Sequence, residues 1–170
     1  MLVVIEGCDG SGKTSLVHEL RRNVGDSYCL SISTSRPRYD EDISSFLMAI
    51  AGLKAMIPGH VILDRFHPIS ELVYGSVLRG KPYSIQALQD RAAFQMVDLI
   101  VYCRPPVSQM VANLDKNPQM GGVREHMVEL AERYDQLMNH LELYQEVVEY
   151  DYRRNDLSEI TKRVFSCSPS

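Results

Sequence analysis

Residues 7–14 constrain this chain more than any other stretch. They read GCDGSGKT, which fits the pattern G-x-x-x-x-G-K-[ST]. The apolar, β-branched run before them predicts a buried strand over residues 2–5, and apolar residues at helical spacing after them predict a helix. A strand, a glycine-rich turn and a helix N-terminus direct several backbone N–H groups at one point, where they bind phosphate groups. The stretch therefore predicts a nucleotide-binding loop, called the phosphate loop below.

The pattern and the residue that follows it are expected to contact the nucleotide through seven residues: Gly7, Gly10, Ser11, Gly12, Lys13, Thr14 and Ser15. Lys13 is expected to reach the β- and γ-phosphates, and the Thr14 hydroxyl to ligate Mg²⁺. Asp64 directly follows a second apolar run, and a carboxylate there would meet the same ion. Arg65, the next residue, has a planar fork that suits a phosphate. The alternatives are a helix or turn cap for Asp64 and a surface ion pair for Arg65.

Composition places the chain among ordinary globular proteins. Its 170 residues fit one domain, expected over residues 1–165 with a frayed tail at 166–170. The net charge of −4 gives no global basic field for nucleic acid. We expect a cytoplasmic protein without a membrane partner, because no signal peptide and no apolar run of membrane-spanning length is visible. A homodimer is left open.

The four cysteines are too far apart in the sequence to suggest a zinc site or a disulfide framework. Free thiols in a reducing compartment fit better. Cys8 has two interpretations. A thiol beside a helix N-terminus can have a lowered pKa, but we favour a small residue that fills the loop.

Predicted strands and helices alternate along the whole chain. Strands are expected at 28–32, 61–63, 98–103 and 147–150 after the first, and helices at 43–57, from Pro68, 84–95, 107–114, from Met127 to Leu141 and near the C-terminus. This alternation predicts an α/β domain with a mainly parallel sheet. Ligands of such sheets bind beyond the carboxyl ends of the strands. The phosphate loop, Asp64 with Arg65, and a polar loop carrying Arg36 and Arg38 all lie at such ends.

The sequence resembles thymidylate kinases over most of its length, in order. VVIEGCDGSGKT is similar to that family's EG-x-DG-x-GK-[ST] loop, and LDRFHPISELVYG at 63–75 to its D-R-[YFH] segment with a serine and an aromatic residue downstream. VDLIVYCRPP at 97–106 resembles the family's P-D-L strand, with Val97 in place of proline. Ser35, Arg36 and Pro37 resemble its arginine-and-proline loop after the second strand.

The resemblance implies a single-domain P-loop kinase with a five-stranded sheet in the order 2-3-1-4-5, flanked by helices. It implies phosphoryl transfer from ATP and Mg²⁺ to a nucleoside monophosphate. By the same resemblance, Asp9 holds the acceptor sugar, and Arg65 and Arg36 hold the acceptor phosphate. Arg38, in the same polar loop as Arg36, is a further candidate for acceptor binding. Tyr74 either lines the acceptor base or is a packed helix residue. Arg154 follows the last predicted strand, where related kinases place the adenine of ATP.

The phosphate loop itself carries no arginine at Cys8, Gly10 or Ser11, so a further cation must come from elsewhere. The polar segment at about 115–125 is the expected lid, with Arg124 the first candidate and Lys116 the second. A plain surface loop is the alternative. The catalytic set predicted is Lys13, Arg65, Asp9 and Arg124.

The acceptor region, about 33–60, is shorter than in thymidylate kinases and has no counterpart of the family's D-R-A arginine.

Three functions stay open. The first is a compact, phage-type deoxynucleoside monophosphate kinase that favours a dTMP-like pyrimidine. The second is a kinase of the same family with a hydroxyl acceptor, either a nucleoside or a 5-hydroxymethyl-pyrimidine in phage DNA, for which Asp9, Glu41 or Asp42 would be the base. The third is a regulatory NTPase. Nucleic acid is a partner only under the DNA alternative, and a viral protein would act in the host cytoplasm.

Overall fold

The computed structural model describes residues 1–23, 29–33, 43–81, 93–115 and 121–166. Its centre is a five-stranded sheet in the order β2-β3-β1-β4-β5, and every neighbouring pair is parallel. The strands are β1 (Leu2–Glu6), β2 (Cys29–Ser33), β3 (His60–Asp64), β4 (Leu99–Cys103) and β5 (Val147–Tyr150). The predicted fold class and strand order are confirmed, and residues 29–32 of the predicted second strand lie in β2.

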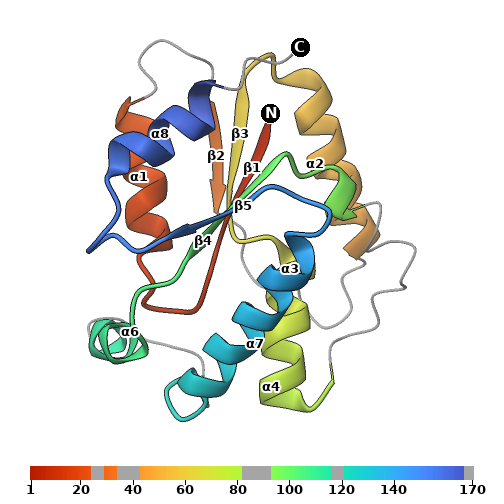
Figure 1. Ribbon diagram of the computed structural model, residues 1–170. Coiled ribbons are helices and arrows are strands. Elements are labelled where there is room, and N and C mark those ends of the chain that lie inside the picture. Colours follow the sequence, from red (N-terminus) through yellow and green to blue (C-terminus); the bar gives the residue numbers. More distant parts are fainter. Residues whose placement is uncertain (24–28, 34–42, 82–92, 116–120, 167–170) are drawn as a thin grey trace.

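Both faces of the sheet are covered, which explains why β1, β3 and β4 are apolar almost without interruption. Side chains of β1 alternate between two cores: Leu2 and Val4 belong to one, Val3 and Ile5 to the other. Helices α1 (Lys13–Asn23) and α8 (Leu157–Ser166) pack on the second core. They lie together on the left of Figure 1.

The first core lies on the opposite face, under α2 (Ile43–Met56), a helical run that follows β3, and α7 (Met127–Leu141). The run after β3 consists of α3 (His67–Ser70), the π-helical turn η1 (Glu71–Gly75) and α4 (Ser76–Arg79). The sequence predicted one helix from Pro68, and the structure adds the π-turn in its middle. Such turns are rare and often occur at functional sites.

Helix α6 (Val107–Leu114) follows the Arg104-Pro105-Pro106 stop after β4, as predicted. Most of the helix predicted at 84–95 lies outside the described residues, but residues 93–95 are helical. No helix in the described part of the chain is long and apolar enough to cross a membrane.

Strand register aligns the carboxyl ends of the central strands. Ile5 pairs with Asp64, and Glu6 pairs with Tyr102. The residues that follow β1, β3 and β4 therefore meet at one edge of the sheet, as expected for the ligand-binding edge of a parallel α/β domain.

Candidate active site

The phosphate loop is held tightly between β4 and α6. Gly7 has φ +141°, and a Cβ there would lie 2.4 Å from the carbonyl oxygen of Cys103. Gly10 has φ +76°, and a Cβ there would lie 2.5 Å from the carbonyl oxygen of Met110. No other residue type fits either position, because both the backbone conformation and the close approach exclude a side chain. These two glycines therefore give the loop its backbone conformation and also allow it to pack closely against β4 and α6.

Lys13 is buried within this loop. Its Nζ donates hydrogen bonds to the carbonyl oxygens of Gly7 at 2.9 Å and Cys8 at 2.7 Å. Burial lowers the pKa of Lys13, and the nearby Arg65 lowers it further. The ammonium group of Lys13 is thus held next to the backbone of Gly7 and Cys8. Ser11 is buried beside it, while Thr14 and Ser15 are exposed on the first turn of α1.

Thr14 and Asp64 come together as predicted. The Thr14 Oγ1 donates to Asp64 Oδ2 at 2.7 Å, across the junction of α1 and β3. No group of three or more His, Cys, Asp or Glu side chains in the described ranges is arranged to hold a metal ion. A hydroxyl and a single carboxylate nevertheless fit Mg²⁺, because this ion takes its other ligands from nucleotide phosphates and water.

Arg65 has φ +79°, the one positive φ of a residue other than glycine among those described. Such conformations are costly, and they cluster at functional sites. The bend turns its guanidinium back to the phosphate loop, where it forms an ion pair with Asp9 and lies 5.4 Å from the centre of the Tyr74 ring. Burial alone would lower the pKa of Arg65, but surrounding groups, including Asp9 and Glu6, keep it well above its usual value. The guanidinium stays charged.

Tyr74 is buried under the loop. Its hydroxyl accepts a hydrogen bond from the backbone N–H of Asp9 at 2.9 Å, and its ring meets Tyr134 edge to face. The structure thus shows the packed residue that was one of the two interpretations. A contact of Tyr74 with an acceptor base stays a prediction.

Glu6 is a site residue that the sequence analysis missed. This fully buried carboxylate accepts hydrogen bonds from Phe66 N at 2.6 Å, Gly7 N at 3.2 Å, Ser70 Oγ at 3.0 Å and Tyr134 Oη at 3.0 Å. Burial raises the pKa of Glu6, opposed by the nearby charges of Arg65 and Lys13 and by the hydrogen bonds from Phe66 and Tyr134. Glu6 therefore ties together the phosphate loop, the segment after β3, and α7. An acidic residue at the end of an otherwise apolar strand was the available signal.

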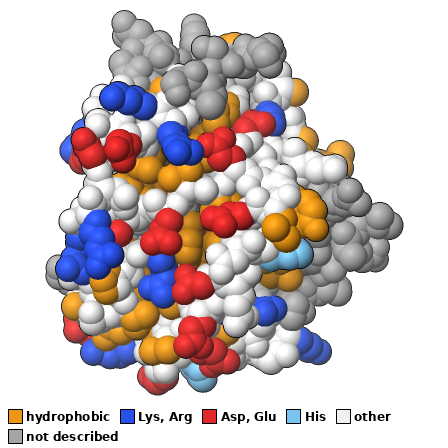
Figure 2. All heavy atoms as spheres, viewed as in Figure 1, with side chains coloured by type: hydrophobic (Ala, Val, Ile, Leu, Met, Phe, Trp, Pro, Cys, Tyr) orange, Lys and Arg blue, Asp and Glu red, His pale blue; other side chains and the backbone are white. Residues whose placement is uncertain are grey.

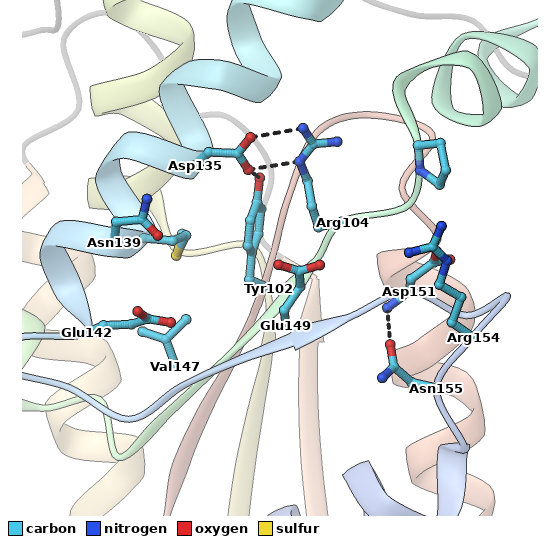
Figure 3. Close-up of a pocket in the computed structure, with 12 residues that line it drawn as sticks. Tyr102, Arg104, Asp135, Asn139, Glu142, Val147, Glu149, Asp151, Arg154 and Asn155 are labelled. Atoms are coloured by element: carbon cyan, nitrogen blue, oxygen red, sulfur yellow. Dashed lines mark hydrogen bonds and ion pairs between the residues drawn. The ribbon is translucent and has the colours of Figure 1, made fainter.

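A second cluster lies at the end of β4. Arg104 donates to both carboxylate oxygens of Asp135, at 2.8 and 2.9 Å, and the Tyr102 hydroxyl donates to Asp135 at 2.7 Å. The cluster borders a cavity of 630 Å³ between α7 and the residues after β5 (Figure 3). Arg154 lies on the side of this cavity opposite α7, with its Nε 3.6 Å from Asp151 and its side chain 77% exposed. A nucleotide contact of Arg154 stays a prediction.

The remaining predicted residues are less informative. Arg124 is exposed and forms an ion pair with Asp115, just after α6, so a catalytic role for it stays a prediction. Lys116, Arg36, Arg38, Glu41 and Asp42 lie outside the described residues. The described side chains on the face in Figure 2 mix acidic and basic groups around exposed hydrophobic atoms.

Cys8 corrects one of our two interpretations. It is 1% exposed, and burial raises the pKa of its thiol to about 12. Burial thus outweighs the adjacent helix N-terminus. The hypothesis of a lowered pKa is wrong, and Cys8 is a packed residue of the loop.

No family model and no curated protein matches the sequence. Solved structures match its fold. YorR protein from Bacillus subtilis, in complex with phosphorylated GDP, has a TM-score of 0.69 at 19% identity, over 96% of this chain and 93% of that one. Deoxyadenosine kinase from M. mycoides has a TM-score of 0.62 at 13% identity with dCMP and dCDP bound, over 96% of both chains. With dATP bound, the same enzyme has a TM-score of 0.54 at 12% identity, over 96% of this chain and 97% of that one. The chain therefore has the fold of P-loop nucleotide kinases.

Proposed function

We propose that this protein transfers the γ-phosphoryl group of ATP, with Mg²⁺, to a deoxynucleoside monophosphate, and that a dTMP-like pyrimidine is its favoured acceptor. One observation carries the proposal: the phosphate loop, the Thr14–Asp64 pair and the Asp9–Arg65 pair converge where β1 and β3 end. This arrangement joins a phosphate cradle, a site for a divalent cation and an arginine fork. These are the components that phosphoryl transfer requires.

The described residues have distinct roles in the reaction we propose. The amides of the phosphate loop and Lys13 bind the donor phosphates, and Thr14 and Asp64 hold Mg²⁺. Bound there, Mg²⁺ would neutralise charge on the phosphate oxygens. Arg65 binds the acceptor phosphate, for which its planar guanidinium is suited. Positioning and charge stabilisation then provide most of the catalysis, since a monophosphate acceptor needs no base.

Asp9 is the proposed link between the two substrates. Its carboxylate lies in the donor loop yet contacts Arg65 on the acceptor side. We propose that it accepts a hydrogen bond from the acceptor sugar while Arg65 moves its fork to the phosphate. Arg36, Arg38 and Arg124 complete the proposed set of cations, and the residues at 115–125 form the proposed lid. We expect a compact phage-type enzyme that acts in cytoplasm.

A second candidate is transfer to a hydroxyl group. The similarity to a protein named deoxyadenosine kinase favours it, because that name implies a nucleoside acceptor. Asp9 would then act as general base, which requires a carboxylate within hydrogen-bond reach of the acceptor hydroxyl. A 5-hydroxymethyl-pyrimidine in DNA belongs to the same chemical class. The net charge of −4 offers little support for it, and lysine and arginine are interspersed with acidic side chains on the face shown in Figure 2, since DNA binding relies on clustered lysine and arginine.

The acceptor is tested by incubating the protein with γ-labelled ATP and Mg²⁺ and with three separate pools. The pools are deoxynucleoside monophosphates, deoxynucleosides and duplex DNA that contains 5-hydroxymethyl-pyrimidines. We expect label in the monophosphate pool, with dTMP or another pyrimidine the best single acceptor. Label in either other pool would establish the second candidate. Hydrolysis of ATP without transfer would contradict both kinase proposals and favour a regulatory NTPase.

A further inference from the structure

Glu6 is a fully buried carboxylate at the end of β1. Within the described part of the chain, each of its oxygens accepts two hydrogen bonds. Oε1 accepts from the backbone N–H of Phe66 at 2.6 Å and from Ser70 Oγ at 3.0 Å. Oε2 accepts from the backbone N–H of Gly7 at 3.2 Å and from Tyr134 Oη at 3.0 Å. Each oxygen therefore faces one backbone N–H and one hydroxyl.

This set of donors requires a carboxylate. A backbone N–H can only donate a hydrogen bond, so the atom that faces it must be an acceptor. In Glu6→Gln, one of the two oxygens would become an NH2 group, which would face the N–H of either Phe66 or Gly7 with no lone pair to accept from it. The two hydroxyl groups can rotate, but the two backbone groups cannot. The local structure therefore depends on the carboxylate itself and not only on the size of the side chain.

The contact with Phe66 fixes the backbone at Arg65. The peptide N–H groups on both sides of the Arg65 Cα are bound by consecutive residues of β1. The N–H of Arg65 donates to the Ile5 carbonyl oxygen at 3.0 Å, and the next N–H along the chain donates to Glu6. Between these two bonds the backbone has φ +79°, a conformation that persists only where surrounding contacts hold it. Ile5 and Glu6 supply such contacts, and the bend directs the guanidinium to Asp9.

The contact with Gly7 links the same carboxylate to the phosphate loop. Gly7 is the first residue of this loop, so Glu6 joins the start of the proposed donor cradle to the peptide that follows Arg65. Its charge also acts on the two buried cations of the site. Burial lowers the pKa of Lys13 and acts in the same direction on Arg65, whereas the nearby charge of Glu6 opposes burial in both.

We propose that Glu6 is a positioning residue of the phosphoryl transfer: it holds the bend at Arg65 in a fixed place relative to Gly7, and so sets the spacing between the acceptor arginine and the phosphate loop. In-line transfer needs this spacing, because a displacement of about 1 Å is enough to lose much of the catalysis that positioning provides. Glu6 acts through Arg65 and contacts neither substrate. The inference rests on the proposed function, since it assumes that Arg65 binds the acceptor phosphate.

A double-mutant cycle separates positioning from general support of the fold. The kcat/KM for the monophosphate acceptor and the affinity for ADP are measured for the wild type, Glu6→Gln, Arg65→Ala and the double variant. We expect Glu6→Gln to lower kcat/KM for the acceptor about 100-fold, the effect of a misplacement of about 1 Å. The affinity for ADP should stay within about fivefold, because close packing against β4 and α6 also holds the loop. In the Arg65→Ala background, Glu6→Gln should lower kcat/KM by less than about threefold, since the side chain that it positions is gone.

Ser70→Ala is the milder variant, because it keeps the carboxylate and both backbone donors and removes one hydroxyl from Oε1. It should lower kcat/KM for the acceptor roughly fivefold, the effect of about one hydrogen bond, and only while the Arg65 side chain is present. Glu159→Gln is the matched control, since Glu159 is an exposed glutamate on α8, and it should leave the kinetics unchanged. Thermal unfolding followed by circular dichroism measures whether each variant is folded.

Losses that add in the cycle would overturn the inference, because Glu6 would then support the fold and not act through Arg65. Wild-type kinetics in Glu6→Gln would overturn it as well. If Glu6→Gln does not fold, the same cycle with Ser70→Ala gives the answer: no loss, or an equal loss with and without the Arg65 side chain, overturns the inference. A wild-type protein that transfers no phosphoryl group, or an unchanged rate in Arg65→Ala, would instead refute the proposed function.

Discussion

The proposed donor half and the proposed acceptor half of the candidate site are built in different ways. The donor half is one contiguous loop of backbone with Lys13 inside it, seated by glycines against β4 and α6. The acceptor half consists of side chains from the loop, the end of β3, η1 and α7, joined through Glu6, Asp9 and Arg65. A short local segment therefore determines one half, while tertiary packing of distant segments determines the other.

This difference has an energetic side. Buried charges are costly unless they are paired or hydrogen-bonded. Lys13 meets this requirement with two carbonyl oxygens of its own loop. Glu6 meets it with donors from four positions in the chain, so the acceptor half should be the more sensitive to changes in packing.

The largest effect is expected from Lys13→Ala in the donor half. Loss of the ammonium at the donor phosphates should lower kcat at least about 1,000-fold, toward the upper end of what one charge-stabilising group contributes. The thermal midpoint should change little, because removing Lys13 also removes a buried charge whose pKa is lowered by burial. Steady-state kinetics and calorimetry measure both quantities. Lys162→Ala, an exposed lysine on α8, is the control. If Lys13→Ala retained activity, the phosphate loop would not take part in the reaction.

Arg65→Ala tests the acceptor half. With a monophosphate acceptor we expect a loss of about 100- to 1,000-fold in kcat/KM, typical for one charged donor to a developing charge. The affinity for ADP should stay within about twofold, since the donor cradle is intact. Arg65→Lys keeps the charge but lacks the planar fork, so it should recover only part of the loss. An unchanged rate in Arg65→Ala would show that Arg65 does not bind the acceptor phosphate.

The same difference explains what could be predicted from the sequence. The glycines, Lys13 and Thr14 form a contiguous pattern whose geometry follows from residue order, and Asp64 is placed by the strand that precedes it. Most strands and helices were also predictable, because apolar periodicity survives in each segment, whereas the strand order came from the resemblance to thymidylate kinases. The acceptor half was only partly predictable. Arg65 was found from its position directly after Asp64, whereas the role of Asp9, and the assignment of both residues to the acceptor, came from a resemblance.

Glu6 was missed for a physical reason. In a sequence, a single acidic residue at a strand end is as compatible with a solvent-exposed carboxylate as with a buried one that accepts several hydrogen bonds. The groups that donate to Glu6 lie between 1 and 128 positions away in the sequence, so no local pattern reveals them. The π-turn η1 and the positive φ of Arg65 were missed likewise, because tertiary contacts and not local preference impose them.

Tyr134→Phe tests the difference between the donor and acceptor halves with a smaller expected effect. It removes one hydrogen bond to Glu6 and leaves the packed ring, so the free energy of unfolding should fall by roughly 1–3 kcal/mol. The KM for the acceptor should rise a few-fold while ADP affinity is unchanged, because α7 belongs to the acceptor half. Denaturant unfolding and steady-state kinetics provide the two measurements. Tyr144→Phe, on an exposed tyrosine, is the control. Equal changes in the KM for the acceptor and in the affinity for ADP would show that the donor and acceptor halves are not independent of each other.

The smallest effect concerns Cys8, the buried side chain of the donor loop. With a thiol pKa of about 12, its thiolate fraction at pH 8 is about a thousandth of that of an unperturbed thiol with a pKa of 9.0. When the native protein is treated with iodoacetamide at pH 8, Cys8 should therefore stay unmodified, as measured by mass spectrometry of peptides. In protein unfolded with urea, Cys8 should react. Rapid labelling of native Cys8 would mean that the donor loop opens readily and is not the rigid half.

The pH dependence of stability gives a second measurement of the same group. The folded state raises the pKa of Cys8 from 9.0 to about 12, so the unfolded chain loses this proton first as pH rises. The stabilising contribution of the neutral thiol is complete below pH 9 and is lost as pH rises through 12. Cys8→Ala should accordingly reduce the decline of unfolding free energy between these values, by at most about 1.4 kcal/mol per pH unit. Cys103, whose thiol pKa burial also raises to about 12, should keep part of the decline in that variant. A slope equal to that of the wild type would show that Cys8 is not buried as a neutral thiol, and the donor loop would then be less tightly packed than the acceptor half.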